Sequence, residues 1–445
     1  MKKKIAFSLV VILSATNLFA QAEDVKYLRS SLSMILLESD DFPNKDAVMS
    51  SWNNYPFPDK YNEHNIDTKN FNVDAMELSN QDLLDAGFLK DTLNNALQIM
   101  KAASDLRPVK YLNDEKTLAV VLPSEKQKYQ LKIDKVIKDN GIARQLVSSW
   151  FTRDGKFSVA AIQERGSYNA SAMEADIAAG NVMSNASLMD AGKQLVQNTF
   201  VTFSKLNFFK NEPAAALTRD LAKVQLAKSM KEKKSPQMLI DKAMQGLDVV
   251  YEETKEGYSL VSKTWLYKLE WNDSIYKTVL CPMWNDVEKL NSTDAFNLEF
   301  VGNQYNTSLV TFKIGEQRTE EQLIDIATVR NMDNAFAKLQ NKNDVFKPMI
   351  PVSSSGPIMA KIGMKEGISA GDKFEVLEMI WDEKAGQTTW KSVGKCSVDK
   401  KAPIWDNRYN LGDGPATDVD ENPVAATQFK GSKKIQVGML LKQLK

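Results

Sequence analysis

The chain has 445 residues, of which 43% are hydrophobic and 26% are charged. This is an ordinary composition for a globular protein, and the length leaves room for about two to four domains. Lysine plus arginine equals aspartate plus glutamate, at 57 each, so no overall charge attracts nucleic acid. The single histidine, His64, argues against zinc enzymes and histidine-based triads, because each needs histidine in a defined role.

The N-terminus has the three parts of a secretory signal peptide. Residues 2–4 are lysines, residues 5–19 are mostly apolar, and small residues offer cleavage after Ala20 or Ala22. We therefore predict a signal peptide at 1–22, and a mature protein in the periplasm, at the outer membrane or at the cell surface. No cysteine for lipidation lies near the cleavage site, and no later apolar run is long enough for a transmembrane helix.

An N-terminal α+β region is predicted for residues 23–110. Residues 27–37 suit either a helix or a strand. The stretch 52–64 is rich in aromatic residues, asparagine and proline, which predicts an ordered loop whose rings pack onto a neighbour. Ser79 predicts the N-cap of a helix from Gln81, and apolar spacing predicts further helix over 89–100.

Residues 111–350 predict a central α/β domain with sandwich-like layers. Short continuous apolar runs predict its first strands, at 117–123, 157–162 and 198–209. Between them, an amphipathic stretch at 142–151 and a polar region rich in alanine and methionine at 170–196 predict helical segments. Such alternation of strand and helix is typical of an α/β fold.

A helical insertion follows these strands. Pro213 occupies the first turn of a predicted helix, and Ser235 with Pro236 begins a second, short helix. The first helix ends in a run of basic residues: Lys228, Lys231, Lys233 and Lys234. We favour a solvated helix end, where cations suit the helix dipole, over a patch that binds an anionic surface.

From Gly257 the sequence turns to strands. Trp265, Tyr267 and Trp271 alternate with residues of the other face, which predicts a strand with one apolar face. We favour a core role for these rings over a sugar-stacking platform. Further strands are predicted at 275–284 and 296–312, and an amphipathic helix is predicted at 320–340 by its apolar periodicity.

The C-terminal residues, 355–445, predict a small SH3-like β-barrel. Its candidate strands are separated by turns with glycine and aspartate, and they lie at 373–381, 388–398 and 435–444. The preceding stretch, 348–357, is rich in proline and serine and predicts a linker. The predicted fold class is therefore mixed α+β and α/β, with a separate barrel.

Few residues are candidates for chemistry. Export would permit a disulfide between Cys281 and Cys396, but we favour two separate buried thiols, because Cys396 lies on the expected inner face of a strand. Two Ser-x-x-Lys spacings, at 392–395 and 397–400, lie in strands, where positions three apart face opposite sides. Acidic residues gather at 413–422, but without the EF-hand spacing we favour a solvated loop over a calcium site. We therefore predict no catalytic, cofactor-binding or metal-ligating residue.

The central part of the chain resembles two known families. Residues 118–209 contain the run 157–159, the pair Glu164-Arg165 and the run 191–195. With these features the segment resembles the α/β core of the curli secretion channel family and the middle domain of flagellar assembly protein T. The channel family is lipidated and contributes membrane β-hairpins. This sequence has no lipidation cysteine and no such strand pair, so the resemblance does not imply a channel.

Two further resemblances involve the rest of the chain. The C-terminal runs 360–367, 371–376, 394–396 and 405–408 resemble the barrel of the same flagellar protein. The whole mature chain, including 29–32 and 58–60, resembles an uncharacterised family of exported Bacteroidota proteins. The first adds to the likeness to envelope assembly proteins, whereas the second covers nearly the whole chain and carries no known activity.

These observations together predict a non-enzymatic exported protein of the cell envelope. It is expected to act in assembly or through protein–protein contact, with other envelope proteins or further copies of itself as partners, and without cofactors or nucleic acid. The alternative is a secreted carbohydrate-binding or carbohydrate-active protein that uses carboxylates and aromatic rings. An open cleft with two carboxylates about 5 to 10 Å apart favours the alternative, whereas a flat apolar patch favours assembly.

Overall fold

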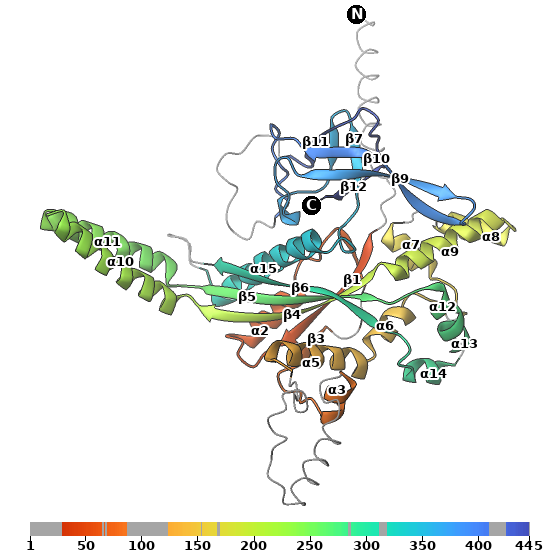
Figure 1. Cartoon of the computed structure of the whole chain (residues 1–445), viewed down its shortest axis with the longest axis horizontal. Helices are drawn as coiled ribbons and strands as arrows, with labels where there is room; N and C mark the ends of the chain where they lie inside the picture. The colour runs from red at the N-terminus through yellow and green to blue at the C-terminus, as the bar shows by residue number, and fades with distance from the viewer. Residues whose placement is uncertain are drawn as a thin grey trace, which may run out of the picture.

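The computed structural model describes residues 29–64, 66, 69–86, 123–152, 154–166, 170–283, 286–310, 318–408 and 424–444. Within them, a six-stranded mixed sheet with helical cover adjoins a closed six-stranded barrel (Figure 1). The mixed α+β fold class and the C-terminal barrel are thus confirmed. Four predicted features lie outside the described residues: the signal peptide, the helix at 89–100, the strand residues 117–122 and the acidic loop at 413–422.

The sheet combines a parallel half with an antiparallel half. Its strands are β1 (Ser30–Glu38), β2 (Tyr61–Glu63), β3 (Asn70–Asn72), β4 (Thr199–Lys210), β5 (Tyr258–Leu269) and β6 (Leu298–Val310). Their order is β2-β1-β4-β5-β6, with β3 also paired to β1. β1 is parallel to β2, β3 and β4, whereas β4, β5 and β6 are successively antiparallel. Of the segment 27–37, which suits either a helix or a strand, residues 30–37 are therefore in a strand, and Leu36 and Leu37 on its two faces are both fully buried.

One face of the sheet is covered by α15 (Glu320–Lys342) and α2 (Lys45–Asn53). A capping box begins α15: Thr319 accepts from the backbone of Gln322, and the Gln322 side chain accepts from the backbone of Thr319. The helix predicted at 320–340 is confirmed, and 14 of its residues are buried. A helix so buried must be packed on more than one side.

A buried polar residue fixes the register of α15 on the sheet. The Asn331 side chain donates to the carbonyl of Leu260 in β5 at 2.9 Å, and its backbone carbonyl accepts from Asn306 in β6 at 2.9 Å. Sliding the helix by one residue would leave these buried groups without partners, which costs about 1–3 kcal/mol for each.

The other face is covered by α5 (Glu125–Asp139) and α6 (Ile142–Ser148), with α3 (Asn80–Asp85) beyond them (Figure 1). Ile133 and Val136 of α5 pack with Phe203, Trp265 and Tyr267 of the sheet. The core role predicted for these rings is therefore confirmed for Trp265 and Tyr267, each 1% exposed. The predicted cap is also confirmed, since the Ser79 hydroxyl accepts from the backbone of Asp82 at 3.2 Å.

Two predicted strands at the far end of the sheet are helical. Residues 157–162 enter α7 (Val159–Arg165), which begins at the N-cap Ser158 and ends at Gly166 in the left-handed region. Residues 275–283 form a π-helical turn (Tyr276–Leu280) between α12 (Asp273–Ile275) and α13 (Cys281–Met283). A short apolar run has no period that separates strand from helix, and here the caps decide. The remaining helices here are α8 (Ala170–Ala178), α9 (Val182–Gln197) and α14 (Val287–Ser292).

The barrel is closed by six antiparallel strands. In spatial order they are β10 (Gln387–Val398), β11 (Thr427–Gly431), β8 (Ile358–Ala360), β7 (Ile350–Ser355), β12 (Leu440–Gln443) and β9 (Lys373–Asp382). The linker predicted at 348–357 is wrong, because this stretch forms β7 and the turn to β8. Ile350 and Val352 are buried in the barrel core. The prolines and serines signalled irregular backbone, but alternate apolar residues still form a strand.

Buried charges attach the barrel to α15 and to the loop after α2. Lys60 Nζ lies 3.7 Å from Glu366 Oε1, and both side chains are at most 6% exposed. Lys365 Nζ lies 3.6 Å from Asp333 Oδ1, at the middle of α15. We call these two ion pairs the clamp. Burial raises the pKa of Asp333, although Lys365 and a tyrosine hydroxyl beside it act in the opposite direction.

The clamp brings residues that are far apart in the sequence into contact. Glu366 accepts hydrogen bonds from the backbone of Gly363 at 2.7 Å and from Asn407 Nδ2 at 2.9 Å. The Lys60 ammonium also lies 5.8 Å from the centre of the Trp405 ring. The run 58–60 and the barrel runs 360–367 and 405–408 therefore meet at one interface.

The predicted insertion is a helical hairpin between β4 and β5. α10 (Glu212–Glu232) and α11 (Gln237–Thr254) extend beyond the end of the sheet, on the opposite side from α8 and α9 (Figure 1). Pro213 lies in the first turn of α10, as predicted. The second helix has 18 residues, so the prediction of a short helix is wrong.

We predict that two glycines in helices respond oppositely to a methyl group. A Cβ at Gly192 in α9 would overlap the Phe157 ring, whereas a Cβ at Gly246 in α11 meets nothing within 4 Å. Gly192→Ala should lower the free energy of unfolding by about 1–3 kcal/mol through overpacking. Gly246→Ala should raise it by up to about 1 kcal/mol through helix propensity. Urea unfolding measures both, and equal effects would contradict the packing described.

We predict that the barrel needs β7 in order to fold. A fragment of residues 347–445 should give a dispersed amide NMR spectrum, because the buried apolar cluster of the barrel is complete within it. A fragment beginning at Ser355 lacks Ile350 and Val352 and should give a narrow spectrum. Equal spectra from the two fragments would show that β7 is dispensable.

We predict strong coupling across the Lys60–Glu366 pair. Glu366→Gln removes one buried charge and should lower the free energy of unfolding by about 1–3 kcal/mol, since Lys60 keeps its ion pair with Asp59 at 2.5 Å. Adding Lys60→Met removes the charge left behind, so the double variant should lose at least about 1 kcal/mol less than the sum of the singles. Additive losses in this double-mutant cycle would mean that the two charges do not interact.

Candidate functional site

The candidates for chemistry have structural roles where the structure describes them. The first Ser-x-x-Lys spacing lies within β10 and the second begins at its end, so neither lies on a helical turn. Trp271, at 9% exposed, joins Trp265 and Tyr267 in the core, and the three rings offer no platform to a sugar. Within the described ranges, no cluster of three or more histidine, cysteine or acidic side chains could hold a metal ion.

The two cysteines are separate free thiols, as favoured. Cys396 faces the barrel core, and burial raises its pKa to about 12, which keeps the thiol protonated and unreactive. The predicted burial of Cys281 is wrong, because this residue is exposed in α13. The misassignment of 275–284 as a strand explains the error.

The single histidine is a packing residue. The His64 ring stacks on Trp150 with centroids 3.8 Å apart, and its Nε2 lies 2.8 Å from Ser149 Oγ and 3.2 Å from the Leu146 carbonyl. Burial lowers the pKa of His64 to about 4. A general base works best with a pKa near the working pH. The Ser149–His64 contact therefore makes a poor nucleophile–base pair.

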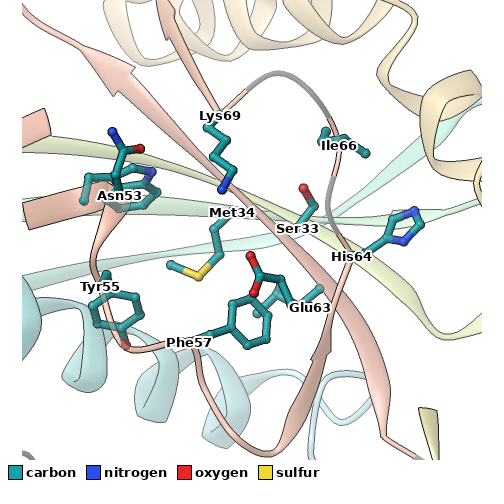
Figure 2. A pocket seen from close by; sticks show the side chains of 11 residues that line it. Ser33, Met34, Asn53, Tyr55, Phe57, Glu63, His64, Ile66 and Lys69 are labelled. Carbon is teal, nitrogen blue, oxygen red and sulfur yellow. The ribbon is translucent and has the colours of Figure 1, made fainter. Parts of the chain in front are cut away.

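An open cavity of ≈ 230 Å³ lies beside this histidine. Figure 2 shows Met34 of β1 at its centre, with Glu63 and Lys69 reaching toward it from opposite sides and Phe57 below. The His64 ring points away from it (Figure 2). The cavity thus offers one carboxylate and one ammonium group over an apolar floor. Among its described lining residues, no hydrogen bond joins a nucleophile to a base.

The most distinctive surface is the helical hairpin, defined here as residues 212–256. No residue of α10 or α11 is buried. Large apolar side chains are instead exposed along both helices: Leu217, Leu221, Val224, Met238, Leu239, Val249 and Val250. Isolated exposed apolar residues are common on protein surfaces, but a concentration on one projecting element marks an interaction site.

Contacts between the two helices use a different side of α10. Lys223 binds Asp248 at 2.5 Å, and the Arg219 guanidinium lies over the Tyr251 ring at 4.2 Å. Leu217, Leu221 and Val224 recur at spacings of four and three, so they form one stripe, which is 56–68% exposed. The sequence pattern alone did not predict this surface. The sequence does indicate an uncovered side, because α10 carries apolar residues on more sides than one partner helix can cover.

In the described parts of the chain, no helix is both long and apolar enough to cross a membrane. A scan of protein-family models gives no match to this chain, and a search of curated proteins gives none either.

We predict that His64 makes the fold sensitive to acid. The unfolded imidazole binds a proton near its ordinary pKa of 6.5, whereas the folded one does so only near 4. The unfolded state therefore binds more protons between these values, and the free energy of unfolding should fall as the pH drops from 6.5 to 4. His64→Gln should flatten this part of the profile. Urea unfolding at several pH values between 6.5 and 4 measures the free energy of unfolding. If the His64→Gln variant shows the same slope against pH as the wild type, the acid sensitivity does not come from His64.

Proposed function

We propose that this protein is a non-enzymatic, exported component of the cell envelope that works by binding other proteins through its helical hairpin. The observation that carries the proposal is a 43-residue excursion between β4 and β5, Glu212 to Thr254, none of whose helical residues is buried. Two long helices without a tertiary core gain little stability from their own chain. Their exposed apolar side chains suit burial against a partner.

Export is supported by the tripartite N-terminal sequence. The resemblance to envelope assembly families agrees with a contact function, and the lowered pKa of His64 makes this residue a poor general base. Trp265 and Tyr267, the rings that a carbohydrate-binding function would use to stack on a sugar, are buried in the core. We therefore assign the function to contact by the hairpin.

We predict that the stripe on α10 is required for binding in the envelope. Leu217→Gln, Leu221→Gln and Val224→Gln, combined, keep helix propensity and change only exposed positions. The matched control is Val182→Gln with Met183→Gln, at exposed apolar positions of α9. After chemical crosslinking of envelope fractions, the hairpin variant should lose its crosslinked products and the control should keep them.

Both variants should unfold like the wild type, which separates lost binding from lost folding. Retention of every crosslinked product by the hairpin variant would place the contact surface elsewhere. Recovery of the wild-type protein from the cytoplasm with an intact Met1 would remove the export part of the proposal.

A further inference from the structure

The hairpin has opposite charges at its two ends. The half that contains the tip, residues 222–247, has six lysines and two acidic residues, for a net charge of +4. The half next to the sheet, residues 212–221 and 248–256, has six acidic and two basic residues, for a net charge of −4. The hairpin is therefore a rod whose ends attract the opposite ends of another rod like it.

The middle of the rod carries an apolar stripe without charge. Leu239, Ala243, Gly246 and Val250 recur on α11 at spacings of four, three and four, so they lie along one side of the helix. Leu239 is 53% exposed and Val250 is 54% exposed. On α10, Leu221 lies near the same level, since the neighbouring Lys223 binds Asp248.

No contact among the described residues explains a glycine at the centre of this stripe. Glycine in a helix interior costs about 1 kcal/mol relative to alanine. A Cβ at Gly246 would meet no atom within 4 Å, so packing within the described chain leaves room for a side chain at this position. Close approach of another helix does require a small residue. Gly246 also lies next to the boundary between the positive and negative halves.

We propose that two copies of this protein pair through their hairpins, antiparallel, about a two-fold axis near Gly246. In this arrangement the +4 tip of each hairpin lies against the −4 base of the other, and the two α11 stripes pack at the centre. Such an interface is isologous, so the pairing closes at two copies. The inference rests on the proposed contact function of the hairpin and names a second copy as the partner.

The area available sets the strength of this pairing. α10 has 21 residues. A helix of that length measures about 31 Å, and two helices side by side are about 20 Å wide, so one face covers about 600 Å². Two such faces bury about 1,200 Å² in total, at the lower limit of specific interfaces. The dimer should therefore be reversible, dependent on concentration and weakened by salt.

Sedimentation equilibrium of the full mature protein tests the proposal with charge reversals. The tip variant is Lys228→Glu with Lys231→Glu, and the base variant is Glu253→Lys with Glu256→Lys. Each variant alone should dimerise at least about tenfold more weakly, which corresponds to 1.4 kcal/mol or more. An equimolar mixture should recover dimers that contain one of each, since the +4 tip of the base variant then faces the −4 base of the tip variant, and the two neutralised ends face each other.

Gly246→Leu tests the close approach at the axis. It should abolish pairing while leaving the unfolding midpoint of the monomer unchanged or higher, because the added side chain enters open space. Dimerisation of this variant at wild-type strength would overturn the proposal. A mixture of tip and base variants that stays monomeric would also overturn it.

Further outcomes separate this inference from the proposed function. A wild-type protein that remains monomeric, but whose crosslinks in the envelope depend on the α10 stripe, overturns the pairing and leaves the contact function intact. If the protein is monomeric and co-floats with phosphatidylglycerol vesicles in a density gradient, and the tip variant does not, the pairing is overturned in favour of binding to a lipid surface. A monomer whose crosslinks do not depend on the stripe overturns both.

Discussion

The rest of the structure depends on the burial of α15 between the sheet and the barrel. Fourteen of its residues are buried. Ile326 and Phe336 belong to the core on the sheet, Asn331 fixes the register, and Asp333 meets Lys365 of the barrel. Because one helix contacts both units, it fixes how the barrel is placed on the sheet. The second buried pair, Lys60–Glu366, closes the same interface from the loop after α2.

The hairpin contrasts with α15 in how much of it is buried. α10 is nearly as long as α15, yet it has no buried residue. Helices gain most of their stability in proteins from tertiary packing. The sheet, its covering helices and the barrel therefore bury apolar cores within the chain, whereas the hairpin helices do not. This contrast directs the functional proposal to the hairpin rather than to the cavity beside β1.

The sequence predicts elements well where periodicity is long or alternation is strong. The apolar periodicity of α15 fits only a helix and the alternation in β5 fits only a strand, and the long apolar run of β4 also forms the predicted strand. Short runs fail: Val159–Arg165 is helical because Ser158 caps it, and Ile350 enters a strand despite nearby prolines. The sequence places apolar residues on more than one side of α10, but apolar periodicity is the same whether a helix faces a core or solvent, so it does not show which side is exposed. Only the folded arrangement shows that nothing in the described chain covers the exposed stripe.

The most direct test of the account is hydrogen exchange of the purified protein at low and high concentration. In the described part of the chain, no residue of α10 or α11 is buried, so the hairpin does not complete its packing there. At low concentration, amides of Glu212–Glu232 and Gln237–Thr254 should exchange much faster than those of β4, β5 and α15, because local opening exposes no core. They should slow as concentration rises, while the rest of the protein stays unchanged. Hairpin amides protected as strongly as α15 in dilute monomer would contradict the account.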